Sequence, residues 1–572
     1  MGVHGAETLA RETDTLLERG IGEGLFGHTR HLAGPLCTVL AAPENDPTES
    51  QPIMMPFSHG TAVWLVSAAM LLPAVARAET QSRVEHALAR VRAAIGWEVV
   101  EQHPGVVRIE GAARLLGTDG RHTQVFDRRG RWLQSIHGPL PSLQGFDGET
   151  AWAIDWNRTH RVLELGDRHM ALLLAAFSSG AWTAPAGELV FDALRELSDG
   201  VALDFHLAGG HMAGVVRLDA STYLPRDVSW KEGSRPVVMS FAQFTDHGGL
   251  RLPDRLTVSI SGSEESIETH SVVFEEAPDD GYFAPRSSPR GDTRFSTDVS
   301  PELKVRRTAT NHILVRPTVD GQDLGWFLFD TGAGINCIST HVAGRLAEGP
   351  IGQLASHGVG GPVMSQLWRA DELRLGPVTV ADQHFLELDL AFLDRPFGVA
   401  VAGIIGWDLL ARCVVEFDQT TPSIALFDPA VYDLADTGHW EELILYQRHP
   451  AVKAQFEGSE GIFKIDTGAA RDTVAMHFET VRDQALLEGR KTRPGSAQGV
   501  GGQVAMSVGE VESFVLGGRE FTDFEAEFAL EDKGAFSDDY SWGNIGGQLL
   551  KPFVMVFDYQ GRRLGFVPRA DP

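Results

Sequence analysis

The stretch Phe-Leu-Phe-Asp-Thr-Gly-Ala-Gly at residues 327–334 has a second copy, Ile-Phe-Lys-Ile-Asp-Thr-Gly-Ala-Ala, at residues 462–470. Each copy is an apolar run that is typical of a β-strand and that ends in Asp-Thr-Gly-Ala. Each copy therefore predicts a strand that carries a carboxylate into a tight loop. The two aspartates, Asp330 and Asp466, are 136 residues apart.

Three further landmarks follow each aspartate in the same order: a Gly-Val-Gly-Gly segment, an apolar segment containing glycine, and an apolar run ending in Phe-Asp. In the first copy they are residues 358–361, 403–410 and 414–418, and in the second copy they are residues 499–502, 544–550 and 554–558. Four landmarks that recur in one order indicate an internal repeat.

These motifs resemble those of the aspartic peptidases of the retropepsin and pepsin group, arranged as two retropepsin-like units in tandem. The resemblance covers residues 309–570. It implies a mainly β fold in which residues 309–430 and 440–570 form two retropepsin-like β-barrel halves of a bilobal aspartic-peptidase domain. It also implies that the halves meet about a pseudo-twofold axis. Because both halves lie in one chain, we expect a monomer.

Asp330 and Asp466 are the candidate catalytic residues. Hydrolysis of a peptide without a metal or a covalent nucleophile needs a positioned water, a base for that water and an acid for the carbonyl oxygen. Two carboxylates held close together supply all three, because like charges at that distance share one proton. Such a pair titrates as a unit, so the sequence leaves open which aspartate is protonated. We expect no metal and no organic cofactor.

The residues that follow each aspartate are expected to support the catalytic loops. A glycine at this position allows two loop backbones to approach without a side-chain clash, which is the role expected of Gly332 and Gly468. In the family that the motifs resemble, each threonine of the loop donates a hydrogen bond to the opposite loop. The resemblance implies this role for Thr331 and Thr467.

Alanine occupies the next position of both loops, at Ala333 and Ala469. A hydroxyl group there would stabilise the charged carboxylate and lower its pKa. Without that hydroxyl the pair is expected to keep its shared proton to higher pH. We therefore expect activity at mildly acidic to near-neutral pH.

The two Gly-Val-Gly-Gly segments are expected to be flaps, that is, flexible hairpins that close over a bound substrate and exclude water. The residues concerned are Gly358, Val359, Gly360, Gly361, Gly499, Val500, Gly501 and Gly502. Their repetition after each Asp-Thr-Gly distinguishes them from ordinary glycine-rich turns.

Length and composition are those of a globular protein with several domains. The chain has 572 residues, of which 43% are hydrophobic and 22% are charged; this predicts three or four domains with sizeable cores. The formal net charge of −28 argues against nucleic acid or an anionic membrane as partner. The three cysteines are Cys37, Cys337 and Cys413. Cys337 and Cys413 are favoured as two buried thiols, and their pairing is left open.

An export signal is predicted at residues 54–78. An apolar run of twelve residues, 61–72, is followed by Pro73 and by the small-x-small site 76–78, as in a secretory signal peptide. Residues 1–53 then form an upstream segment that need not be translated if synthesis starts at Met54 or Met55. This predicts a periplasmic or secreted protein; an uncleaved anchor or a buried helix is the alternative.

Residues 79–285 are expected to form a largely antiparallel β domain, because short alternating runs are separated by turn residues. An amphipathic helix is expected from Gln81 to about Trp97. The segments at 145–152 and 223–226 weakly resemble half-barrel lipoprotein carriers of the bacterial periplasm. This resemblance implies a possible lipid or lipoprotein ligand, with a packing domain that has no ligand as the alternative. Residues 286–308 are expected to be a linker.

The sequence thus predicts an exported aspartic endopeptidase that acts on polypeptides. The alternative is a catalytically inactive extracytoplasmic protein that binds a peptide or a lipid on the same fold. A further alternative is that residues 79–300 are a pro-segment removed on activation.

Overall fold

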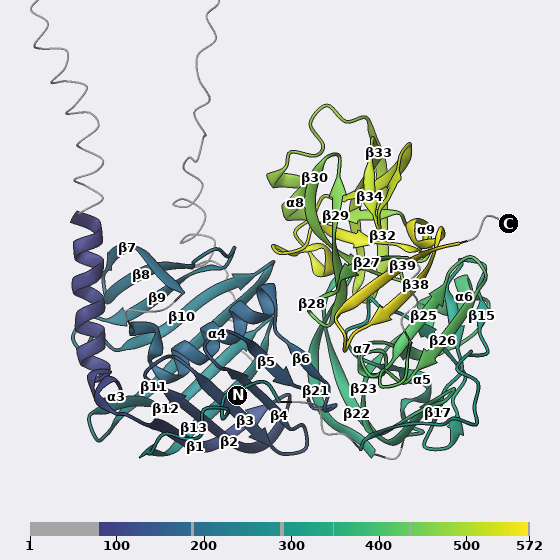
Figure 1. Cartoon of the computed structure of the whole chain (residues 1–572). Helices are drawn as coiled ribbons and strands as arrows, with labels where there is room; N and C mark the ends of the chain where they lie inside the picture. The colour runs from purple at the N-terminus through teal and green to yellow at the C-terminus, as the bar shows by residue number, and fades with distance from the viewer. Residues whose placement is uncertain (1–78, 185–187, 287–290, 347, 434–437, 570–572) are drawn as a thin grey trace, which may run out of the picture. The chain divides into compact units, whose positions relative to one another are not determined.

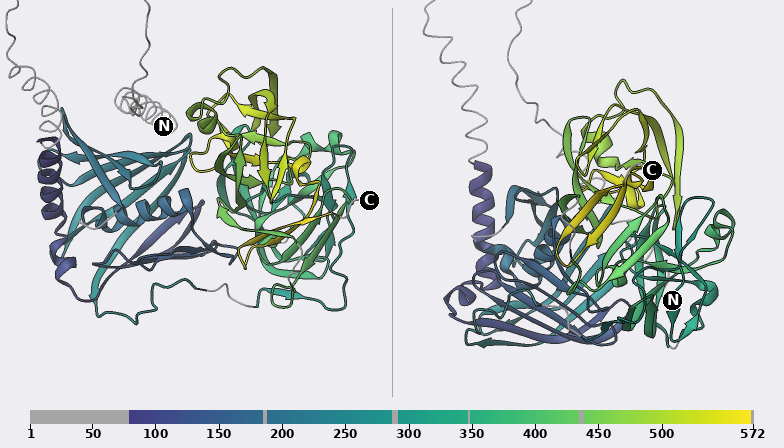
Figure 2. Two further views of the ribbon diagram at one scale, coloured as in Figure 1. Left: turned by 45° about the horizontal axis from the view of Figure 1, so that its top comes forward. Right: turned by 45° about the vertical axis from the view of Figure 1, so that its right-hand side comes forward.

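A computed structural model describes residues 79–184, 188–286, 291–346, 348–433 and 438–569. Residues 80–572 form one compact unit, and its described part is mainly β-strand in every view of Figures 1 and 2. The predicted upstream segment, 1–53, and the predicted signal peptide, 54–78, lie outside the described residues. No helix among the described residues is long and apolar enough to cross a membrane.

The first part of this unit is a 13-stranded sheet in which every pair of neighbouring strands is antiparallel. The strand order is β6-β5-β4-β3-β2-β1-β13-β12-β11-β10-β9-β8-β7, so two meanders join where β1 pairs with β13. The large antiparallel sheet expected from the sequence is confirmed. Its strands are β1 (Val106–Leu115), β2 (Thr118–Asp127), β3 (Trp132–His137), β4 (Ser142–Phe146), β5 (Ala151–Ile154), β6 (His160–Val162), β7 (Leu189–Leu197), β8 (Gly200–Leu207), β9 (Ala213–Asp219), β10 (Pro225–Glu232), β11 (Arg235–His247), β12 (Leu250–Ile260) and β13 (Ser263–Glu275).

Helices pack against this sheet. Residues 79–95 are helical, and the expected apolar face is confirmed, since Val84, Val91 and Ile95 are buried. The helix α4 (Leu165–Ser179) connects the two edge strands and lies against one face of the sheet (Figure 1). The short α3 (Glu98–Gln102) and η1 (Ala181–Thr183) complete the described helical elements of this part.

Aromatic side chains fill the space between α4 and the sheet. Phe177 of α4 packs against Trp182, Phe205 and Trp230, with ring centroids 5.3–6.3 Å apart. The cavity lined by Phe177 and Trp182 has a volume of only about 10 Å³, which is the space of roughly one water molecule. The lipid or lipoprotein ligand expected from the sequence stays a prediction.

The segment 286–308 is not the plain linker expected from its composition. Thr293–Phe295 forms β14, which pairs antiparallel with β23, and Arg306–Arg307 forms β15. The ring of Phe295 packs against a large hydrophobic core. This part of the segment is ordered because its backbone completes a sheet edge, which its polar composition did not indicate.

The next part is an 11-stranded sheet with three short helices, α5 (Thr340–Ala343), α6 (Ala391–Phe397) and α7 (Trp407–Leu410). Besides β14 and β15, its strands are β16 (Ile313–Val315), β17 (Thr318–Val319), β18 (Gln322–Asp323), β19 (Trp326–Phe329), β20 (Cys337–Ser339), β21 (Glu348–Gly358), β22 (Gly361–Leu375), β23 (Val378–Leu388) and β24 (Val401–Ile405).

A 10-stranded sheet follows, with α8 (Phe478–Asp483), α9 (Gly547–Leu550) and η2 (Gly534–Phe536). Its strands are β28 (Ile444–Tyr446), β29 (His449–Phe456), β30 (Ser459–Ile465), β31 (Val474–Met476), β32 (Thr492–Gly499), β33 (Gly502–Val511), β34 (Phe514–Leu516), β35 (Arg519–Phe521), β36 (Phe524–Ala529) and β37 (Gly543–Ile545).

The central strands of these two sheets pair in the same way. In the first, β19 is parallel to β24, β24 is antiparallel to β20, and β20 is parallel to β23. In the second, β30 is parallel to β37, β37 is antiparallel to β31, and β31 is parallel to β36. The repeated sequence landmarks thus correspond to repeated strand pairing.

A five-stranded sheet joins the two copies, in the order β26 (Ser423–Phe427), β25 (Val414–Asp418), β38 (Phe553–Asp558), β39 (Arg563–Pro568) and β27 (His439–Glu442). The two repeated Phe-Asp landmarks pair directly here, because β25 is antiparallel to β38 with Glu416 opposite Val556. The equivalent strands of the two copies, β25 and β38, are therefore direct neighbours.

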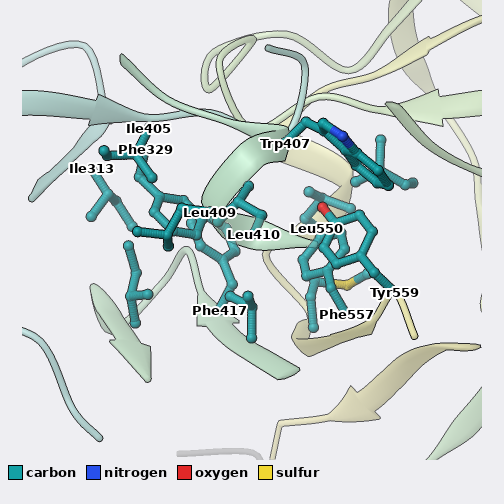
Figure 3. Close-up of a cluster of buried hydrophobic side chains, with 14 of the residues drawn as sticks. Ile313, Phe329, Ile405, Trp407, Leu409, Leu410, Phe417, Leu550, Phe557 and Tyr559 are labelled. Carbon is teal, nitrogen blue, oxygen red and sulfur yellow. The ribbon is translucent and has the colours of Figure 1, made fainter. Parts of the chain in front are cut away.

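One hydrophobic core runs through both copies. Figure 3 shows Phe329, Trp407 and Phe417 of the first copy in the same cluster as Leu550 and Phe557 of the second. The ring of Phe417 stacks on that of Phe329, with centroids 5.9 Å apart. The core therefore supports the residue that precedes Asp330.

Cys337 and Cys413 are both buried, and both are free thiols. This confirms the two buried thiols that the sequence analysis favoured. Burial raises the pKa of each thiol above its ordinary value.

The substitution Phe417→Ala should lower the free energy of unfolding by about 3–5 kcal/mol, because it leaves a cavity in the shared core. Phe417 is 1% exposed, whereas Phe392 in α6 is 36% exposed, so Phe392→Ala is the matched control. Denaturant unfolding of both variants measures the difference. Equal losses in the two variants would contradict the shared core.

Candidate active site

The repeated aspartates stand at the ends of equivalent strands. Asp330 follows β19 and Asp466 follows β30. The backbone N–H of Asp330 donates to the Ile405 carbonyl at 3.0 Å, and that of Asp466 donates to the Ile545 carbonyl at 2.9 Å. The apolar segments that contain glycine therefore support the two loops from beneath.

Two buried threonines link the loops by reciprocal hydrogen bonds. The backbone N–H of Thr331 donates to Oγ1 of Thr467 at 3.0 Å, and the N–H of Thr467 donates to Oγ1 of Thr331 at 3.1 Å. Each hydroxyl also donates to the strand before the opposite aspartate, at Ile465 and Phe329. Both threonines are 2% exposed, so water cannot replace these bonds.

The glycine of each loop faces the carboxyl group of the other loop. A Cβ atom on Gly332 would lie 2.5 Å from Oδ1 of Asp466, and one on Gly468 would lie 2.6 Å from Cγ of Asp330. Any side chain would therefore collide with the opposite aspartate. Here glycine is required for close approach of the two loops.

The two carboxyl groups lie close together, because the N–H of Gly468, in the loop of Asp466, donates to Oδ1 of Asp330 at 3.1 Å. Burial raises the pKa of Asp330 and that of Asp466, and the nearby charge of Asp330 raises the pKa of Asp466 further. The pair therefore keeps one proton at a pH where isolated aspartates would both be ionised.

The backbone donors around the pair are arranged asymmetrically. Oδ1 of Asp330 accepts from the N–H groups of Gly332 at 2.8 Å and Gly468 at 3.1 Å. Oδ1 of Asp466 accepts from the N–H of Ala469 at 3.1 Å. Two N–H donors stabilise an ionised carboxylate more than one does, so this geometry favours the charge on Asp330 and the shared proton on Asp466.

The residues expected to be flaps form two hairpin tips that touch. Gly358 pairs with Gly361 between β21 and β22, and Gly499 pairs with Gly502 between β32 and β33. The N–H of Gly360, in the first tip, donates to the carbonyl of Val500 in the second at 3.0 Å. The hairpins predicted from the sequence therefore meet across the two copies.

The valine of each hairpin tip packs against the opposite copy. Val500 packs against a cluster of the first copy that includes Leu328, two residues before Asp330. Val359 packs against a cluster of the second copy that includes Ala475 and Met506. Each tip thus makes its apolar contact on the opposite copy.

The sequence analysis missed two histidines at the outer side of the loops. Nε2 of His312 lies 2.9 Å from the carbonyl oxygen of Gly468, and Nε2 of His449 lies beside the other loop, 3.7 Å from where a Cβ atom on Gly334 would be. Their positions, 18 residues before Asp330 and 17 before Asp466, are a recurring signal that could have identified them.

Among the described residues no group of three or more His, Cys, Asp or Glu side chains is placed to hold a metal ion. The two loops that carry the pair consist of threonine, glycine and alanine after each aspartate. The arrangement can therefore hold one proton between two carboxyl groups and move it.

A family model described as aspartyl protease matches residues 315–409. The match contains Asp330, Thr331 and Gly332, the first hairpin tip and the segment up to Leu409. No curated protein sequence matches the chain.

Thr331→Ala should lower the free energy of unfolding by about 2–4 kcal/mol, because it leaves the Thr467 N–H and the Ile465 carbonyl buried without partners. Thr331→Ser keeps the hydroxyl and is the matched control, with an expected loss of about 1 kcal/mol or less for the missing methyl group. Denaturant unfolding measures both losses. An alanine variant as stable as the serine variant would show that the threonine link contributes little.

The stability of the wild-type chain should fall as pH rises from about 5 to about 8. Because burial raises the pKa of Asp330 and Asp466 above the unfolded value of about 4, the folded state binds more protons than the unfolded state in this range. Asp466→Asn removes one titrating carboxyl, so its melting temperature should fall less over the same range. Parallel melting curves for the two proteins would contradict the shared proton.

Proposed function

We propose that the chain is an aspartic endopeptidase that hydrolyses peptide bonds with a water activated between Asp330 and Asp466. In this proposal residues 309–430 and 440–570 are two retropepsin-like halves of one bilobal catalytic domain. The family match over residues 315–409 supports the class of enzyme, and the equivalent strand pairing around β19 and β30 supports the second half.

The close approach of the two aspartate loops, in which each glycine faces the carboxyl group of the other loop, is the observation that carries the proposal. Asp330 and Asp466 come from loops far apart in the sequence, and the Thr331–Thr467 link holds those loops together. Bringing two buried carboxyls into contact raises their pKa and costs stability. A fold that retains so costly a pair has a chemical use for its shared proton.

The first step follows from the asymmetry of the pair. The ionised Asp330 removes a proton from water, and the oxygen of that water forms a bond to the peptide carbonyl carbon. Asp466 transfers its proton to the carbonyl oxygen at the same time. The product is a neutral tetrahedral diol, and the single negative charge has moved to Asp466.

The second step restores the pair. Asp330, now protonated, donates to the amide nitrogen while Asp466 removes a proton from one hydroxyl of the diol. The carbon–nitrogen bond breaks, so that an amine and a carboxylic acid leave. Asp466 again holds the shared proton, and no cofactor is consumed.

The hairpin tips, the presence of both aspartates in one chain and the predicted export signal fit the same activity. We assign the hairpin tips at Gly360 and Val500 as flaps that open to admit a polypeptide and close to exclude water. Both aspartates come from one chain, so the proposed enzyme works as a monomer. The export signal predicted at residues 54–78 would place it in the periplasm or outside the cell.

The wild-type chain should cleave unfolded casein, with maximal activity at mildly acidic to near-neutral pH, and Asp330→Asn and Asp466→Asn should each abolish cleavage. Loss of the shared proton at high pH and protonation of Asp330 at low pH should bound the activity on both sides. A statine-type transition-state mimic should inhibit the wild type. Assays between about pH 3 and pH 8 measure the profile around the ordinary carboxyl and histidine pKa values.

Asp298→Asn is the matched control, because this aspartate is exposed and lies outside the loops. It should cleave as the wild type does. Cleavage that persists in Asp330→Asn would overturn the proposal, and so would a profile peaking below about pH 3, at or under the ordinary carboxyl pKa. No cleavage at any pH would favour the peptide-binding alternative.

A further inference from the structure

The outer face of each catalytic loop is contacted by a histidine of the opposite half. Nε2 of His312, at the start of the first half, lies 2.9 Å from the Gly468 carbonyl oxygen, and His449, at the start of the second half, lies beside the loop of Asp330 at Gly334. The ring of His312 also packs on Phe397, with ring centroids 4.5 Å apart. The two histidines occupy equivalent positions in the two halves, as the two aspartates do.

The protonation of His312 follows from its partners. A carbonyl oxygen can only accept, so Nε2 of His312 carries the hydrogen that is donated to Gly468. Burial lowers the pKa of His312 below its ordinary value, so the ring is neutral and Nδ1 is an acceptor. Nδ1 therefore accepts from the hydroxyl of Thr310, 2.8 Å away.

A second threonine extends this chain of hydrogen bonds. The hydroxyls of Thr308 and Thr310 are 3.0 Å apart, and because Thr310 donates to His312, its oxygen accepts from Thr308. The hydroxyl oxygen of Thr308 also accepts from the backbone N–H of His312 at 3.1 Å. The tautomer and the orientation of the ring are therefore determined by its own half.

One peptide group connects the His312–Gly468 hydrogen bond to Asp466. The carbonyl of Gly468 and the N–H of Ala469 belong to the same peptide, and that N–H donates to Oδ1 of Asp466 at 3.1 Å. A donor at the carbonyl holds the peptide plane in place and polarises its N–H, which strengthens the bond to the carboxylate.

We infer that His312 is a positioning residue for the proposed peptidase: its Nε2–H holds the Gly468–Ala469 peptide so that the N–H of Ala469 stabilises ionised Asp466. The inference rests on the proposed function for its effect on catalysis. Asp466 is ionised after it has given its proton to the carbonyl oxygen, so the contact acts when the tetrahedral diol forms.

His449 is the weaker counterpart. Its Nδ1 is buried and has no hydrogen-bond partner among the described residues. The positions equivalent to Thr310 and Thr308 hold Gln447 and Leu445, so no equivalent pair of hydroxyls orients its ring. The better-supported histidine thus contacts the loop that carries Asp466, the aspartate to which the shared proton is assigned.

The charged groups around these histidines and around Asp466 are few. Arg471 faces His312, while Lys464, Asp167 and Asp538 face His449. Asp330 and Asp472 are the acidic groups that influence Asp466 or are influenced by it. The variants below leave all of these charged groups in place.

His312→Leu should lower kcat about tenfold or more with little change in KM, because the loop that holds Asp466 loses its outer support. The pH at which Asp466 loses the shared proton should rise, since a weaker N–H donor stabilises its carboxylate less. His312→Gln keeps a side-chain N–H donor and should recover part of kcat. His270→Leu, which replaces an exposed histidine of β13, is the matched control and should behave as the wild type.

A second measurement does not depend on activity. Above about pH 7, His312 is neutral in both the folded and the unfolded state, so melting temperatures in this range respond to the aspartate pair and not to the histidine itself. The pH-dependent loss of stability should extend to higher pH in His312→Leu but not in His270→Leu. An inactive wild type would contradict the proposed function and still leave this shift to be measured. Unchanged kcat in an active His312→Leu variant, or an unchanged melting profile, would overturn the role of His312.

Discussion

The reciprocal hydrogen bonds between Thr331 and Thr467 are the constraint on which the candidate site depends. Two carboxyl groups in a buried environment repel each other when both are ionised, and burial penalises even one charge. Asp330 and Asp466 stay in contact because four bonds formed by the threonine hydroxyls and N–H groups tie their loops together. The paired strands β25 and β38 and the core that they share hold the two halves in the register that these bonds need.

The hydrogen bonds around the aspartate pair form three layers. The threonines lie beneath the carboxyl groups, the N–H groups of Gly332, Gly468 and Ala469 contact the carboxyls directly, and His312 supports the glycine carbonyl from outside. Only the threonine layer is fully symmetric. Because both halves belong to one chain, each half is free to specialise, which a homodimer of identical halves cannot do. This freedom accounts for the two N–H donors at Oδ1 of Asp330 and the one at Oδ1 of Asp466.

The sequence anticipated the parts of this protein that depend on local pattern. Asp-Thr-Gly after an apolar run, the glycine hairpins and the alternating strands of residues 79–285 each reflect short-range rules of strand and turn formation. Their repetition at matching intervals also indicated which loops are equivalent. The strand β14 in the segment 286–308 was not predicted from the sequence, because it forms by pairing with the distant strand β23. The aromatic cluster of Phe177, Trp182 and Trp230 was not predicted either, because such packing has no signature in a strand pattern.

By itself, the sequence determined the identity and the order of the reactive groups: two aspartates, each followed by threonine, glycine and alanine. Only the tertiary structure decided which atoms meet: the N–H of Gly468 with Asp330, Gly360 with Val500, and His312 with Gly468. The physical reason is separation along the chain. His312 and Gly468 are 156 residues apart, and hydrogen bonds over such distances form only once the strands on both sides have packed into one core.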